Sequence, residues 1–184
     1  RNPGDAGIPP EFDWGGSANV AAVRLHWPVP HVFTLNGMRT IGYREELVLP
    51  VEIEAADPSR PIRLRASVDL GICRDICMPA ALSLDASLPV GGRPDPVIRR
   101  AMAAGPEPAR TAGLGRIACR VEPIDDGLRL TAEMDLPATG AREMVVMEPG
   151  LPSVWVSEAE TARSGGRLTA VSDTSDIESV PTIA

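Results

Sequence analysis

The feature that most constrains the fold is an alternation of apolar and polar residues with a period of two. It is clearest over residues 62–70, where one face would carry Ile62, Leu64, Ala66, Val68 and Leu70. The residues between them are Arg63, Arg65, Ser67 and Asp69. This pattern is typical of an antiparallel strand that has one buried face and one wet face. Residues 21–27, 47–53 and 82–88 repeat it, whereas helical periodicity is almost absent, so the sequence predicts an all-β protein.

Two stretches rich in proline and glycine divide the chain. Residues 91–96 read Gly-Gly-Arg-Pro-Asp-Pro, residues 105–108 read Gly-Pro-Glu-Pro, and the segment between them is long enough for two helical turns. Further apolar rows follow at 117–121, 128–136, 145–147, 154–156 and 168–171, with turn signals at 125–127 and 165–166. We therefore expect two β-sandwich units, at 12–90 and 111–172, joined by a linker at 91–110 with a short helix and followed by a polar tail at 173–184.

Composition excludes several classes of function. The net charge of −7 and the pI of about 4.9 leave no broad basic surface, so nucleic acid is not an expected partner. No apolar run approaches the roughly 18 residues that a membrane-spanning helix needs. No glycine-rich phosphate loop follows a strand, and no Cys-x-x-Cys is present. No Ser/His/Asp set can be assembled with only two histidines. Hydrolase, kinase and thioredoxin-fold interpretations therefore lose support, and no cofactor is expected.

The segment 71–79, Gly-Ile-Cys-Arg-Asp-Ile-Cys-Met-Pro, is the most informative about chemistry. It is predicted to be a loop between two strands, with Cys73 and Cys77 four positions apart. Two cysteines at this spacing can form a disulfide when a turn brings their Cα atoms within about 7 Å. A bond that closes so short a loop constrains little of the unfolded chain, which favours redox chemistry over a structural role. The alternative is that both are ordinary buried thiols.

Four other residues could bind a metal or react as a thiol. Cys119 alternates with its neighbours in an apolar row and is predicted to be a core thiol. His26 and His31 show no ligand spacing, and a structural role is favoured over a zinc site. Met78 is expected to be a packing residue, although a thioether beside two thiols is a donor set that suits Cu(I).

The segment 42–51, Gly-Tyr-Arg-Glu-Glu-Leu-Val-Leu-Pro-Val, together with the strand at 64–70, the cysteine segment 71–79 and the run Leu-His-Trp-Pro at 25–28, resembles a known family. It is similar to the N-terminal periplasmic domain of the thiol:disulfide interchange protein DsbD, and in form is closer to ScsB, of the suppressor-of-copper-sensitivity system. The motifs cover about residues 14–90.

This resemblance implies immunoglobulin-like units and a protein-disulfide reductase activity, with this chain as one domain of a larger membrane enzyme. It implies that Cys73 and Cys77 pass electrons from a membrane-embedded donor domain to oxidised periplasmic proteins of the thioredoxin-like or disulfide isomerase-like kind. The expected location is the periplasm, tethered to the inner membrane. Better-known members space the cysteines more widely and shield them with an aromatic residue on a cap loop, for which the candidates here are Phe33, Ile41 and Tyr43.

The two cysteines are expected to have different roles. Pro79 holds the residues before it extended, so Cys77 should be presented outward, while Cys73 follows a strand and should be shielded by the sheet. Cys77 is therefore predicted to bond to partners and Cys73 to resolve the mixed disulfide, as the family resemblance also implies. Two alternatives stay open: a Cu(I) site at Cys73, Cys77 and Met78, with a link to copper tolerance, or a purely structural immunoglobulin-like binding module.

Overall fold

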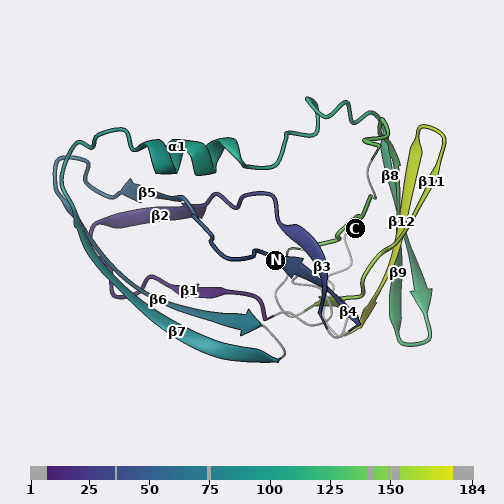
Figure 1. Cartoon of the computed structure of the whole chain (residues 1–184), viewed down its shortest axis with the longest axis horizontal. Coiled ribbons are helices and arrows are strands. Elements are labelled where there is room, and N and C mark those ends of the chain that lie inside the picture. The colour runs from purple at the N-terminus through teal and green to yellow at the C-terminus, as the bar shows by residue number, and fades with distance from the viewer. Residues whose placement is uncertain are drawn as a thin grey trace, which may run out of the picture. The chain divides into compact units, whose positions relative to one another are not determined.

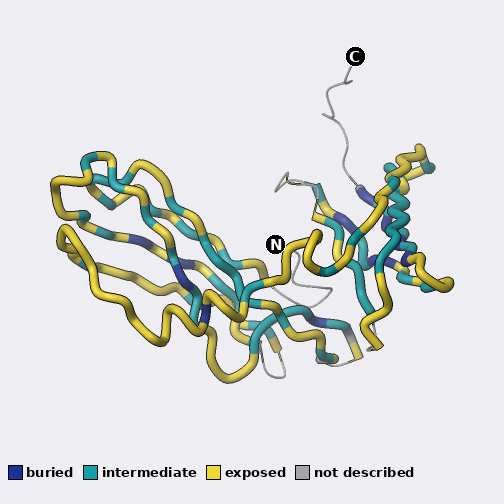
Figure 2. Tube along the Cα trace, turned by 90° about the horizontal axis from the view of Figure 1, so that it is seen from above, coloured by how far each residue is buried: buried dark blue, intermediate teal, exposed yellow. Residues whose placement is uncertain are grey.

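The computed structural model describes residues 8–35, 37–73, 76–140, 143–148, 150 and 154–175. The chain divides into two compact units, Pro3–Pro106 and Glu107–Ala184, and the division falls inside the segment expected to be a linker (Figure 1). Both units consist of antiparallel strands, which confirms the predicted all-β class. Along many strands exposed and less exposed residues alternate, as Figure 2 shows.

The described residues of the first unit form seven strands and one helix. Three sheets form it: β1 (Glu11–Asp13) with β6 (Ile62–Cys73) and β7 (Cys77–Leu88), β2 (Val20–Leu25) with β5 (Val51–Ala55), and β3 (His31–Leu35) with β4 (Met38–Gly42). The helix α1 (Pro96–Ala103) begins where the Asp95 carboxylate accepts hydrogen bonds from two backbone N–H groups of its first turn. No helix of the described residues has the length and apolar character needed to span a bilayer.

The hairpin β6–β7 is the longest feature of this unit. Its register runs without interruption from Ile62 opposite Leu88 to Cys73 opposite Cys77. The apolar row predicted from the sequence faces inward, and Ala66 and Val68 on it are buried. The polar row, which includes Arg65, faces solvent. Because successive side chains of a strand point to opposite faces, the apolar row of β6 and the even-numbered residues of β7 share one face of the hairpin.

A cluster of aromatic rings connects β1 to the rest of the unit. Phe12 lies opposite Val68 in the ladder, stacks on Trp14 at a centroid distance of 5.8 Å, and meets the edge of Trp27 at 6.2 Å. Trp27 in turn stacks on Tyr43 at 6.0 Å, and the Tyr43 hydroxyl donates a hydrogen bond of 2.7 Å to the Pro28 carbonyl. Large apolar rings of this kind bury much surface, so the cluster fixes β1 beside β6.

The second unit is built on one sheet. Its strands are β8 (Ile117–Ile124), β9 (Gly127–Asp135), β10 (Trp155–Val156), β11 (Glu160–Ser164) and β12 (Arg167–Ser175), in the order β10-β12-β9-β8, with β11 also paired to β12. One face of β12 supplies most of the buried residues of this unit, namely Leu168, Ala170, Ser172 and Thr174, and Val156 and Ala159 are also buried. Strand β12 continues past residue 172, where the second domain was expected to end. The strand predicted at 145–147 is absent, since residues 143–148 have no regular structure.

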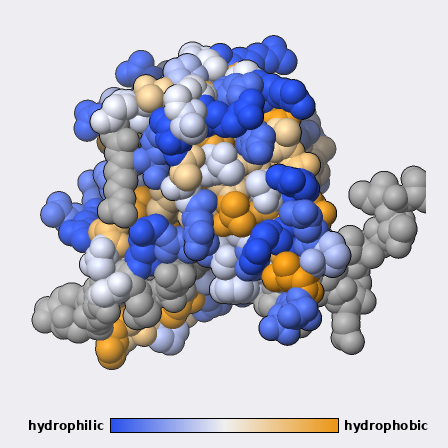
Figure 3. All heavy atoms as spheres, turned by 90° about the vertical axis from the view of Figure 1, so that its right-hand side faces the viewer, coloured by the Kyte–Doolittle hydropathy of each residue, from blue (hydrophilic) through white to orange (hydrophobic). Residues whose placement is uncertain are grey.

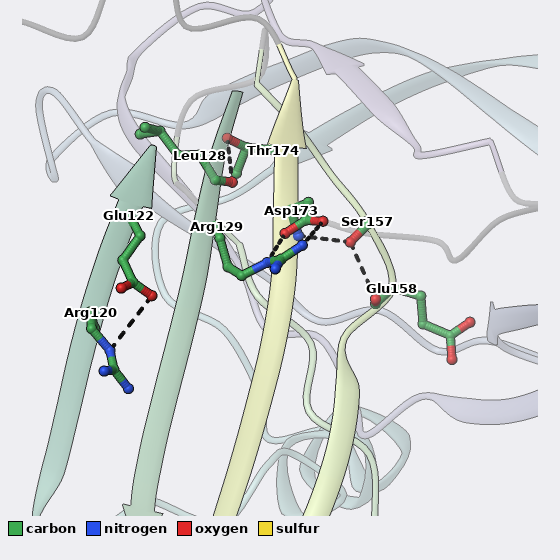
Figure 4. A network of polar contacts seen from close by, with 8 residues as sticks. All are labelled: Arg120, Glu122, Leu128, Arg129, Ser157, Glu158, Asp173 and Thr174. Carbon is green, nitrogen blue, oxygen red and sulfur yellow. Dashed lines mark hydrogen bonds and ion pairs between the residues drawn. The ribbon is translucent and has the colours of Figure 1, made fainter. Parts of the chain in front are cut away.

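The opposite face of this sheet carries ion pairs. Arg129 donates two hydrogen bonds to Asp173, of 2.8 and 2.9 Å, and the Asp173 backbone N–H donates to the Ser157 hydroxyl at 2.9 Å (Figure 4). Arg129 lies on β9 and Asp173 on β12, so the bidentate pair bridges neighbouring strands. Figure 3 shows the side of the molecule on which these strands lie, where hydrophilic side chains surround a few apolar ones.

Candidate redox site

A disulfide joins Cys73, the last residue of β6, to Cys77, the first residue of β7. The two residues are direct cross-strand partners, and their Cα atoms are 4.0 Å apart. The sequence predicted a loop over 71–79, and this extent is wrong, because Gly71 pairs with Pro79 and Ile72 with Met78 in the ladder. Apolar Ile72 and Met78 and a proline suited to an edge strand let the hairpin continue to its tip.

The disulfide lies on the polar face of the hairpin. Cys73 and Cys77 are separated from Arg65 and Asp85 by an even number of positions along their strands, so all four side chains lie on the same face. Arg65 and Asp85 form a cross-strand ion pair of 2.9 Å there. Both cysteines are partly exposed. The bond is therefore reachable from solvent without opening the apolar face, on which Ala66 and Val68 are buried.

Ile8 packs against Gly71, which lies two residues before the disulfide-bonded Cys73. A Cβ atom placed on Gly71 would come within 2.6 Å of the Ile8 Cβ, so a glycine is required for Ile8 to lie where it does. Gly71 is two residues before Cys73 and therefore on the same side of the strand. Sequence analysis missed this neighbour, because nothing in the local pattern connects residue 8 with residue 71.

The two cysteines differ in their place in the sheet. The order β1-β6-β7 makes β6 the inner strand and β7 the edge strand. Cys73 thus lies on a strand that pairs with β7 on one side and with β1 on the other, whereas Cys77 lies on the edge strand. An approach along the plane of the sheet meets Cys77 first.

Comparisons with known proteins show a similar family and a similar fold. Residues 3–88 match the model of the family described as thiol:disulfide interchange protein DsbD, N-terminal. The crystal structure of the N-terminal periplasmic domain of ScsB from Proteus mirabilis is similar in fold, with a TM-score of 0.67 and 23% sequence identity, and the match covers 96% of this chain and 68% of that chain. No curated protein matches the sequence significantly.

The cap loop expected from the family resemblance can be located in the structure. The segment that was expected to contain a cap loop forms the hairpin β3–β4, in which Phe33 lies opposite Thr40 and Ile41 opposite Val32. The Arg44 guanidinium sits 4.3 Å from the centre of the Phe33 ring, and the Tyr43 ring stacks on Trp27. Phe33, Ile41 and Tyr43 thus have defined neighbours, and a shielding role for any of them stays a prediction.

The tip of the hairpin is rich in exposed apolar side chains. Ile72 is 59% exposed, Ile76 70% and Met78 58%. Met78 is the cross-strand partner of Ile72, so its side chain points to the face opposite the disulfide. The chain therefore does not direct the Met78 thioether toward the sulfur atoms of Cys73 and Cys77 in this oxidised form. Within the described residues, no group of three or more His, Cys, Asp or Glu side chains is arranged to hold a metal ion.

The prediction of a buried Cys119 is wrong. Its strand β8 is the edge strand of the second sheet, and Cys119 is an exposed free thiol. Its neighbours in the apolar row, Ile117 and Val121, are 51% and 56% exposed. The alternation correctly indicated a strand, but an edge strand can leave even its apolar row uncovered.

The two histidines lie on different elements. The His26 ring is 2.6 Å from a carboxylate oxygen of Glu52, and this hydrogen bond, followed by the charge of Arg24, holds the pKa of Glu52 below its ordinary value. His31 begins β3. His26 is thus engaged in a cross-strand polar contact between β2 and its partner β5.

Proposed function

We propose that this chain is a periplasmic thiol:disulfide exchange module, in which the Cys73–Cys77 pair passes two electrons from a membrane-embedded donor domain to oxidised periplasmic proteins. The observation that carries the proposal is a disulfide across the tip of a hairpin, partly exposed and at a sheet edge, within residues that match the model of the DsbD N-terminal family. The periplasmic location of the similar ScsB domain supports the periplasmic assignment. Tethering to the inner membrane and acceptors of the thioredoxin-like or disulfide isomerase-like kind belong to the same proposal.

The position of the disulfide supports redox use over a structural role. Only three residues separate the cysteines, and the ladder of β6 and β7 already holds the two strands together. In the chain-entropy model, stabilisation by a disulfide grows with the length of the loop that it closes, so this bond contributes less than one between distant strands. A bond that is accessible and contributes little to stability can be broken and remade without unfolding the module.

The exchange itself follows from two thiols. In the reduced module, the Cys77 thiolate attacks one sulfur of the partner's disulfide, which forms a mixed disulfide and releases the partner's other sulfur as a thiolate. The Cys73 thiolate then attacks the Cys77 sulfur, which restores the Cys73–Cys77 disulfide and releases the partner fully reduced. Two electrons pass to the partner, and the membrane donor must supply two electrons to reduce the module again. The edge position of Cys77 supports this division of roles.

Trapping of the mixed disulfide tests the proposal. Because Cys119 is an exposed thiol, every variant should also carry Cys119→Ser, which removes adducts at that position. With an oxidised thioredoxin as probe, Cys73→Ser should accumulate a covalent adduct that peptide mapping places at Cys77, and Cys77→Ser should accumulate little.

Two outcomes would contradict different parts of the proposal. An adduct found mainly at Cys73 in the Cys77→Ser variant would reverse the roles of the two cysteines. If mass-resolved alkylation shows that Cys73 and Cys77 do not cycle between dithiol and disulfide under mild reductant and air, the exchange function itself is wrong.

A further inference from the structure

Among the described residues, no strand covers the outer edge of β7. Nine of its twelve residues are exposed, and no backbone hydrogen bond outside the β6–β7 ladder joins residues 78–88 to the described part of the chain. Its register against β6 contains no bulge, and its single charged side chain, Asp85, is paired with Arg65. Proteins usually protect a long edge strand with several charges, a bulge or a covering segment. An edge without these features is a template for pairing with another strand.

The backbone groups that point to this free edge can be identified. On the far side of β6, Arg63 exchanges two backbone hydrogen bonds with Ala18, of 2.8 and 3.1 Å, and the Arg65 N–H and C=O both bond to the Ser17 hydroxyl. The backbone N–H and C=O groups of the odd-numbered residues of β6 therefore point away from β7. The pairs that these residues form with β7, including Cys73 with Cys77, are non-hydrogen-bonded pairs. The short Cα separation of 4.0 Å at the cysteines agrees with this class.

It follows that the odd-numbered residues of β7 direct their backbone groups outward. Pro79 fits this assignment, since proline has no N–H and is tolerated in a strand where that side faces away from the ladder. Ala81 and Ser83 then offer N–H and C=O groups to an added strand, beginning four residues after Cys77. On the face opposite the disulfide, such a strand would also meet an exposed apolar row: Met78 at 58%, Leu82 at 49%, Leu84 at 45% and Leu88 at 37%.

From these observations we propose that the module also reduces partners that present their disulfide on an extended segment, which pairs with the free edge of β7 and places the attacked cysteine directly opposite Cys77. The occupant is a protein segment with apolar residues next to the cysteine in sequence. Residues beside the cysteine point to the opposite face of an added strand, where they cover the row that begins at Met78. This inference rests on the proposed function and names how that same site recognises its partner.

The pairing also aligns the sulfur atoms for the second step of exchange. Opposed residues on neighbouring strands have Cα atoms about 4.5–5.5 Å apart, within the range of about 4.4–6.8 Å that disulfides span. With a partner strand beside β7, the three cysteines occupy one row across three strands on one face. Attack of Cys73 on the Cys77 sulfur then proceeds along the line to the departing partner sulfur, which is the geometry that thiol–disulfide exchange requires.

The substitution Ala81→Pro tests the pairing, because it removes an N–H that points to the free edge and leaves the β6–β7 hydrogen bonds in place. The probes are two disulfides mixed with the same small thiol, 2-mercaptoethanol: an extended octapeptide with valines and leucines around its single cysteine, and the symmetric hydroxyethyl disulfide. The ratio of the two second-order rate constants should fall about fivefold in Ala81→Pro, the usual value of one hydrogen bond.

A second variant and a matched control keep the test decisive if Ala81→Pro perturbs the hairpin. Leu82→Ser should lower the same ratio several-fold through lost apolar contact, whereas Val121→Ser, on the edge strand β8 and 56% exposed, should leave both rate constants unchanged. An unchanged ratio in Ala81→Pro and in Leu82→Ser would overturn the edge-pairing inference. Failure of the unsubstituted protein to reduce either probe would instead contradict the proposed function.

Discussion

The hairpins β6–β7 and β8–β9 have the same plan and different surroundings. In each, one strand lies inside a sheet and the other, β7 or β8, lies at its edge with apolar residues exposed. Beyond β9 lies β12, which pairs with it over eight residues, from Arg167 to Thr174. Beyond β6, β1 pairs over three residues, Glu11 to Asp13, and Ala18 forms an isolated bridge to Arg63. The tip of β6–β7 is thus much less supported by other strands.

The tips of the two hairpins differ in chemistry as well. The loop of β8–β9 consists of Asp125 and Asp126, whereas the β6–β7 tip has the disulfide with Ile72, Ile76 and Met78 around it, all strongly exposed. An exposed apolar edge is common to both hairpins and indicates no function by itself. The combination that distinguishes β6–β7 is an accessible disulfide on an edge almost without charge, and this is what a surface for partner proteins requires.

Among the substitutions that probe the difference between the two hairpins, Gly71→Ala should have the largest effect on stability. A Cβ there would lie 2.6 Å from the Ile8 Cβ, so Gly71→Ala should displace Ile8 and lower the stability of the first unit by roughly 1–3 kcal/mol, as overpacking does. The Cys73–Cys77 disulfide should also be reduced faster by dithiothreitol. Chemical denaturation and reduction kinetics would measure the two effects. Gly92→Ala is the control, since a Cβ at Gly92 meets nothing within 4 Å; equal behaviour of the two variants would refute the packing role of Ile8.

A smaller effect is expected where β9 is joined to β12. The two hydrogen bonds from Arg129 hold the pKa of Asp173 below its ordinary value. A depressed folded-state pKa contributes stability above the unfolded-state pKa, near pH 4, and loses it as the pH falls through the folded-state value. Asp173→Asn should therefore lower the unfolding midpoint of the second unit slightly at pH 7, with a difference that shrinks below about pH 4. Thermal unfolding at both pH values would measure it, and a difference independent of pH would contradict the ion-pair explanation.

The smallest effect is expected at Cys119 on the edge strand β8. Because the thiol is exposed, Cys119→Ser should change the stability of the second unit by less than about 0.5 kcal/mol. In the native protein, iodoacetamide should modify Cys119 without denaturant and leave the disulfide-bonded Cys73 and Cys77 unmodified. Intact-mass analysis would show one added group; protection of Cys119 until the protein is unfolded would mean that β8 is covered in solution.

The sequence predicted the parts of the fold that depend on local pattern. Alternation located β6 and β9 well, because apolar side chains that share one face of a strand must recur at every second position. Alternation did not find β3 and β4, in a region where the family resemblance suggested a cap loop. It also predicted a strand at 145–147 that is absent. Short strands have too few residues for a period to stand out, and an apolar stretch can pack against a sheet without joining it.

What the sequence by itself determined is the cysteine pair beside a strong strand, the all-β class and the similarity of residues 3–88 to the DsbD N-terminal family. What only the tertiary structure decided is the environment of each sulfur: Ile8 beside Gly71, Cys77 on an edge strand, and Cys119 exposed instead of buried. The physical reason is that periodicity reports which face of a strand is apolar, whereas pairing between distant segments decides which strand becomes the edge and which face is covered.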